Sequence, residues 1–140
     1  SLRHGLAHEY THQLLSDMTN DNASYWLQEG AAMYYEAFFS GEKPSMERNF
    51  KPYTIQQLEN MNLEKLNDEE AYRYYLSCYA QFQSFLSKFR EDKIASAMRQ
   101  LHQFPYIDLD SSKKQKVTNH RTDKILIENK ILHLPPSHSS

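Results

Sequence analysis

Two histidines and a glutamate near the start of the chain have the types and spacing of a metal site. His8 and His12 are four positions apart, and Glu9 directly follows the first of them. In an α-helix, residues four apart lie one turn from each other on the same face, so the two imidazoles can converge on one cation. Two neutral imidazoles suit zinc. A third protein ligand, with water in the fourth position, would make such a site catalytic.

Glu9 fits a separate role in the same site. It is rotated by roughly 100° from His8 around the helix axis, so it can reach a metal-activated water without binding the metal itself. It would then act as a general base. The H-E-x-x-H pattern alone also arises by chance in helices whose histidines are only solvated. His4, one turn before His8, is interpreted as a surface histidine or as one that contacts a metal ligand without binding the metal.

A second segment, Trp26 to Glu36, reads WLQEGAAMYYE. Together with H-E-x-x-H upstream, it resembles the gluzincin metallopeptidases, in which a W-L-x-E-G-x-A-x-Y-x-E helix supplies a glutamate as the third zinc ligand. The resemblance implies this role for Glu29, whereas the alternative is a glutamate favoured only by the helix dipole. Glu36, two turns after Glu29 on the same helix face, could orient a zinc-bound histidine or be merely solvated.

A third segment begins at Tyr79-Ala80-Gln81. It is similar to the Y-A-Q helix of bacterial peptidase MA-like domains, in which a tyrosine near the zinc can hydrogen-bond the developing oxyanion. The resemblance covers about residues 1–101 and implies this role for Tyr79, with Tyr75 as the alternative. Both tyrosines also belong to a regular aromatic face, which is typical of a core.

Capping and turn residues predict five helices. They cover residues 2–18, 25–40, 54–60, 68–90 and 93–103, with Gly41 ending the second. The predicted N-caps are Ser24, Thr54, Asn67 and Asp92. Gly30 is expected to permit the close approach of a neighbouring helix. The expected core aromatics are Tyr34, Tyr35, Phe38, Phe39, Tyr72, Tyr75, Tyr79 and Phe82.

We therefore expect a mainly α fold, a zincin-like helical bundle around the H-E-x-x-H helix. The resemblance also implies an N-terminal β-sheet part, most of which this chain would lack, so we expect it to be a truncated product or the C-terminal part of something longer. Residues 1–104 would form the metallopeptidase-like domain and residues 105–140 a linker and tail. Within the tail, we expect a polar linker at 111–116, a weak helix or a strand at 123–134, and disorder at 135–140.

Composition excludes several classes of protein. With 140 residues, the chain has the length of one domain with one core. The formal net charge of −2 gives no basic surface for nucleic acid. The single cysteine, Cys78, excludes an intrachain disulfide and is expected to be buried. No apolar run is long enough to span a membrane.

These features together predict zinc-dependent peptide-bond hydrolysis. One Zn²⁺ would be held by His8, His12 and Glu29, with Glu9 as general base and Tyr79 at the oxyanion. The expected partner is a peptide or protein substrate. One alternative is a non-catalytic, zinc-binding peptidase-like interaction module. Another is a helical interaction domain in which the H-E-x-x-H pattern is accidental and no metal binds.

Overall fold

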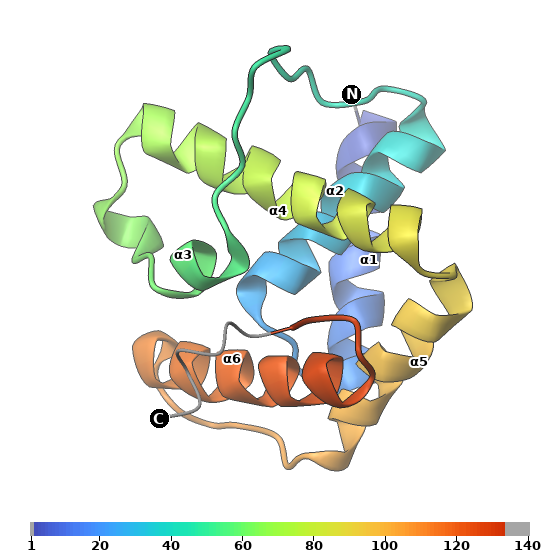
Figure 1. Ribbon diagram of the computed structural model, residues 1–140, viewed down its shortest axis with the longest axis vertical. Coiled ribbons are helices and arrows are strands. Elements are labelled where there is room, and N and C mark those ends of the chain that lie inside the picture. The colour runs from blue at the N-terminus through green and yellow to red at the C-terminus, as the bar shows by residue number, and fades with distance from the viewer. Residues whose placement is uncertain (1, 134–140) are drawn as a thin grey trace.

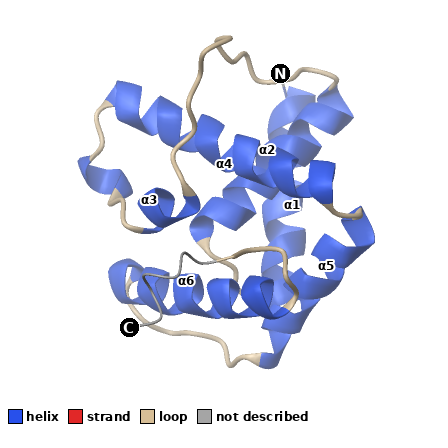
Figure 2. Ribbon diagram, in the orientation of Figure 1, coloured by secondary structure: helices blue, strands red, loops and turns tan. Residues whose placement is uncertain are grey.

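A computed structural model describes residues 2–133, which form helices joined by loops (Figure 1). The helices are α1 Leu2–Thr19, α2 Tyr25–Ser40, α3 Ile55–Glu59, α4 Asp68–Lys88, α5 Glu91–Gln100 and α6 Ser111–Glu128, with 3₁₀ turns at Leu63–Lys65 and Leu101–Gln103. No strand occurs among residues 2–133 (Figure 2). The prediction of a mainly α fold is confirmed. None of the helices in this described part is both long and apolar enough to cross a membrane.

Close packing of α1, α2 and α4 forms the part of the molecule that carries the predicted site. The chain turns sharply after α1, and α2 returns antiparallel to it, while α4 crosses α2 (Figure 1). At the crossing, a Cβ atom added to Gly30 would lie 2.3 Å from the backbone carbonyl oxygen of Cys78. Only glycine permits this approach, as the sequence predicted.

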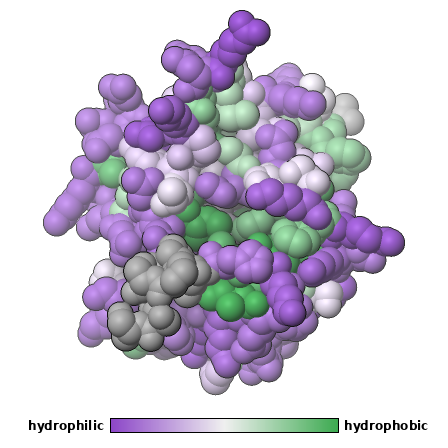
Figure 3. Space-filling model, in the orientation of Figure 1, coloured by the Kyte–Doolittle hydropathy of each residue, from purple (hydrophilic) through white to green (hydrophobic). Residues whose placement is uncertain are grey.

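Apolar residues from α2, α4, α5 and α6 share one core. Leu58 of α3 and Leu101 of the second 3₁₀ turn also belong to it, and its largest buried apolar side chains are Trp26, Leu27, Tyr74, Leu58, Ile94, Leu101, Ile125 and Leu126. On the face shown in Figure 3, hydrophobic side chains are gathered between α4 and α6 and are surrounded by hydrophilic ones. Cys78 is fully buried, as predicted.

The local signals for helix ends succeed where the capping side chain is exposed. Thr54 and Asn67 each form the predicted capping box, and Gly41 ends α2 with a left-handed φ of 75°. Ser24 is at the N-cap position, but its side chain makes no cap hydrogen bond, and its backbone N–H donates to Thr122 Oγ1 of α6 at 2.8 Å. The prediction for Asp92 is wrong, since it lies inside the first turn of α5.

Three of the predicted core aromatics are exposed. Phe38 and Phe39 are 70% and 52% exposed, because they lie in the last turns of α2, beyond the crossing with α4. Tyr72 is 60% exposed in the first turns of α4, where its hydroxyl donates to the Ser45 carbonyl oxygen. The helix periodicity was right, but it did not show how far along each helix the neighbouring helix extends.

The C-terminal region corrects the expectation of a linker. Residues 111–116 form the first turns of α6, with the Asp110 side chain as N-cap, and residues 123–128 complete the same helix. The buried face of α6 includes the polar residues Thr118, Asn119 and Thr122. The sequence therefore lacks the regular spacing of apolar residues that would have predicted a packed helix here. The expectation of disorder over 135–140 lies outside the described residues.

Candidate metal centre

The antiparallel pairing of α1 and α2 brings His8, His12 and Glu29 together. His8 and His12 lie one turn apart on α1, and their Nε2 atoms are 3.0 Å from each other. Glu29, near the start of α2, places Oε1 3.2 Å from His8 Nε2 and Oε2 3.1 Å from His12 Nε2. All three residues that the sequence predicted as ligands therefore converge.

The remaining nitrogen of each imidazole has its own acceptor. His8 Nδ1 lies 2.7 Å from Glu36 Oε2, and His12 Nδ1 lies 3.4 Å from Gln28 Oε1. With protons on the two Nδ1 atoms donated to these oxygens, loss of the protons on Nε2 would leave the Nε2 lone pairs for a cation. The predicted role of Glu36 in orienting a histidine agrees with this contact. Gln28 was missed, because nothing in its spacing distinguishes it from a solvated residue.

Glu29 is held as an anion in spite of its burial. Only 6% of the residue is exposed, and this burial opposes ionisation. Hydrogen bonds from His12 and His8 outweigh that effect and lower the pKa of Glu29 to about 2. The same bonds to Glu29 raise the pKa of His8 and His12 above 6.5, although burial of the rings opposes this. Protons here occupy positions that a cation could take.

The donor set and its dimensions fit zinc. Two imidazole nitrogens and a carboxylate oxygen are a common ligand set for a catalytic zinc site. Ligands bound at about 2.0–2.1 Å in a tetrahedron lie about 3.3 Å from one another, and the separations among His8, His12 and Glu29 are 3.0–3.2 Å. Among the residues that the structure describes, these three form the group whose ligand atoms converge in this way.

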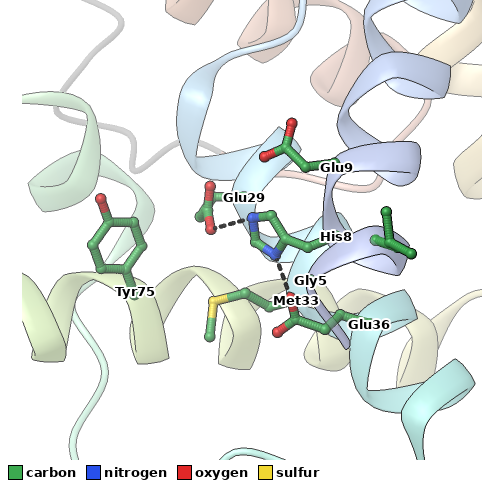
Figure 4. Close-up of a pocket in the computed structure, with 8 residues that line it drawn as sticks. Gly5, His8, Glu9, Glu29, Met33, Glu36 and Tyr75 are labelled. Atoms are coloured by element: carbon green, nitrogen blue, oxygen red, sulfur yellow. Dashed lines mark ion pairs between the residues drawn. The ribbon is translucent and has the colours of Figure 1, made fainter. Parts of the chain in front are cut away.

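A pocket of about 710 Å³ opens beside these ligands. Its lining residues are Gly5, Leu6, His8, Glu9, Glu29, Met33, Glu36 and Tyr75. Figure 4 shows Glu9 beside His8 and Glu29, and Tyr75 reaching in from α4 on the opposite side. Glu9 is exposed to solvent and no ion pair involves it in the described part of the chain. The pocket thus provides an accessible carboxylate and a phenol near the three ligands.

The structure does not bring Tyr79 to this pocket. Tyr79 lines a separate hollow with Tyr34 and Phe38, and its ring stacks on Tyr34 with centroids 6.5 Å apart. The alternative tyrosine, Tyr75, lies one turn earlier on α4 and lines the pocket with His8 and Glu29. A motif match alone could not separate two tyrosines one turn apart. The side chain of His4 lies outside the described part of the structure.

Comparison with known proteins gives no relative from which a function could be transferred. No family model, curated protein or solved structure matches the chain. The resemblance to the gluzincin peptidases therefore stays a prediction from three short motifs, and the functional inference depends on the geometry of the pocket itself.

Proposed function

We propose that the chain is a zinc-dependent peptidase, in which His8, His12 and Glu29 hold one Zn²⁺. The observation that supports this proposal best is the convergence of three neutral or anionic donors beside the accessible carboxylate of Glu9. Zinc bound by such donors lowers the pKa of water to about 7 and polarises a carbonyl group.

Glu9 would supply the proton transfers. Its position directly after His8 on α1 places it in the pocket, where it is exposed rather than engaged with the ligands. A carboxylate there can accept a proton from the attacking water and return it to the leaving amine, which completes cleavage of the peptide bond. Glu36 and Gln28 would meanwhile hold the two imidazoles in orientation.

Tyr75 would donate a hydrogen bond to the carbonyl oxygen as negative charge develops on it. The lining of the pocket favours Tyr75 over Tyr79 for this role. We expect Tyr75→Phe to lower kcat by about 100-fold, while Tyr79→Phe stays close to wild type. Steady-state kinetics on the best substrate of a peptide panel measure both variants. A large loss in Tyr79→Phe with normal Tyr75→Phe would reverse the assignment.

The experiment that tests the proposed function compares zinc-loaded wild type with Glu9→Gln on a panel of fluorogenic peptides. Glu9→Gln should retain zinc and lose about 10²-fold or more of the hydrolysis rate. Glu47→Gln, which changes an exposed loop glutamate, is the matched control. Full activity of Glu9→Gln excludes Glu9 as the base. Tight zinc binding without hydrolysis of any peptide, or of a protein such as casein, would favour the non-catalytic module instead.

A further inference from the structure

A second pair of acidic residues meets where α3, α6 and α2 pack together. The carboxyl groups of Glu59, at the end of α3, and Asp123, in α6, are in hydrogen-bond contact. Trp26 Nε1 of α2 donates to Glu59 Oε2 at 2.9 Å. Asp123 Oδ1 is completely buried and has no hydrogen-bond donor among the described residues. Two carboxylates cannot hydrogen-bond to each other, so this contact requires a proton.

The surroundings favour retention of that proton. Burial raises the pKa of Glu59, and the adjacent Asp123 carboxyl raises it further, against the opposing effect of the Trp26 hydrogen bond. Burial also raises the pKa of Asp123, which Glu59 and His120 oppose. His120, exposed on α6, opposes the raised pKa of Asp123. The hollow beside Glu59 is also lined by Tyr25 of α2 and by the charged residues Asp21, Glu64, Lys114 and Lys116, while the α2 group bonded to Glu59 is the neutral indole of Trp26.

Polar contacts around the pair tie three helices together. The Ser24 backbone N–H, at the start of α2, donates to Thr122 Oγ1 at 2.8 Å. Asn119 Nδ2 donates to the Glu59 carbonyl oxygen at 3.2 Å. This side of α6 is held against α2 and α3 by hydrogen bonds as well as by apolar contacts. A negative charge that appears on Asp123 within this buried polar contact therefore weakens the packing of α6 against the two helices.

We propose that Glu59 and Asp123 form a proton-dependent latch, which fastens α3 and α6 to the start of α2 while the two carboxyls share a proton and loosens when that proton is lost. The latch does not depend on the proposed peptidase activity. Trp26 lies three positions before Glu29 on α2, so loosening also affects the helix that carries a metal ligand.

The latch makes folding stability depend on pH in a defined direction. In the unfolded chain both carboxyls lose their protons near pH 4, whereas the folded pair keeps one. Stability from the pair is therefore complete below that pH and falls as pH rises toward the raised pKa of the folded pair. Over this interval, the unfolding equilibrium constant rises about tenfold per pH unit through this one proton.

Trp26 is the only tryptophan in the chain, so its fluorescence reports directly on Glu59. We would measure urea unfolding from about pH 5 upward, and Trp26 emission up to about pH 10, so that the titration passes through the raised pKa of the pair. Glu59→Gln is the key variant, because its amide can accept from Trp26 and donate to Asp123, which replaces the shared proton. Asp123→Asn is a second isosteric variant, and Glu64→Gln, an exposed glutamate nearby, is the control.

The expected result is a pH-dependent change of Trp26 emission in wild type and Glu64→Gln that is absent from Glu59→Gln and moves to lower pH in Asp123→Asn, because burial alone still raises the pKa of Glu59 there. The ratio of the unfolding constants of wild type and Glu59→Gln should also rise about tenfold per pH unit. An emission that stays constant with pH in wild type, an emission change at the same pH in wild type and Asp123→Asn, or an equal pH dependence of unfolding in wild type and Glu59→Gln, overturns the proposal. The fluorescence titration of wild type decides the question even if one variant does not fold.

Discussion

Glu29 and Glu59 are both largely buried, yet the protein shifts their pKa values in opposite directions. Burial is the largest effect on each, and it opposes ionisation in both cases. Glu29 faces two imidazoles and has a pKa lowered to about 2, whereas Glu59 faces another carboxyl and has a raised pKa. The chemistry of the partner, rather than the extent of burial, therefore decides that Glu29 can attract a cation and that Glu59 retains a proton.

Both glutamates depend on the same helix. Glu29 belongs to α2, and Glu59 is hydrogen-bonded to Trp26 of α2. The helix directs Glu29 toward α1 and Trp26 toward Glu59 of α3. Substitutions at Glu29, at residues that contact it, or in α2 itself can therefore test the metal site and the carboxyl pair separately.

Removal of the Glu29 carboxylate should have the largest effect. In Glu29→Ala, two imidazoles remain without a third ligand, so we expect zinc affinity to fall by about 100-fold or more. This exceeds the loss typical when a residue that only hydrogen-bonds a metal ligand is removed. A competition titration with a chromophoric chelator measures this, with Glu47→Ala as control. Unchanged affinity in Glu29→Ala would place the metal elsewhere and end the contrast with Glu59.

Gly30→Ala tests the packing of α2, the helix that carries Glu29 and the Trp26 donor to Glu59. The new Cβ would lie 2.3 Å from the Cys78 carbonyl oxygen, and because that atom is backbone, α2 or α4 must shift. We expect a loss of about 1–3 kcal/mol in the free energy of unfolding. Gly5→Ala is the matched control, because its Cβ would meet nothing within 4 Å. That variant should be as stable as wild type or gain up to about 1 kcal/mol. Equal stability of the two variants would refute the close crossing.

Glu36→Ala should have a smaller effect on the metal site than Glu29→Ala. It removes the acceptor of His8 Nδ1 but no ligand, so zinc affinity should fall by about 10-fold. Glu36→Gln, which keeps an oxygen acceptor without the charge, should lie between Glu36→Ala and wild type in the same titration. If Glu36→Ala binds zinc as tightly as wild type, the orientation of His8 does not depend on this contact.

The parts of the structure that the sequence predicted are those in which the signal is local. His8 and His12 are placed together by helical spacing alone, and a short connection brings Glu29 to them. The capping boxes at Thr54 and Asn67 each involve residues three positions apart. In these cases, the interacting atoms lie within one turn or on two helices joined by a tight turn.

The sequence failed where distant residues decide the outcome. Within α6, the sequence predicted a polar linker over 111–116 and a weak helix or a strand over 123–134. The buried Asn119 and Thr122 between these segments are polar, and their hydrogen bonds to α3 and α2 cannot be inferred from local spacing. The Glu59–Asp123 contact likewise joins residues from two separate helices. Tyr75 was ranked behind Tyr79 because the crossing of α2 and α4, which separates their two pockets, is a property of the packed helices.

The zinc content of the purified wild-type chain, measured by elemental mass spectrometry after zinc is supplied to the folded protein, tests the central claim most directly. Three converging donors with the geometry of His8, His12 and Glu29 predict about one zinc per chain, retained through gel filtration. A chain that remains folded and carries no zinc would contradict the claim, and the convergence would then be a network of hydrogen bonds between two histidines and a glutamate.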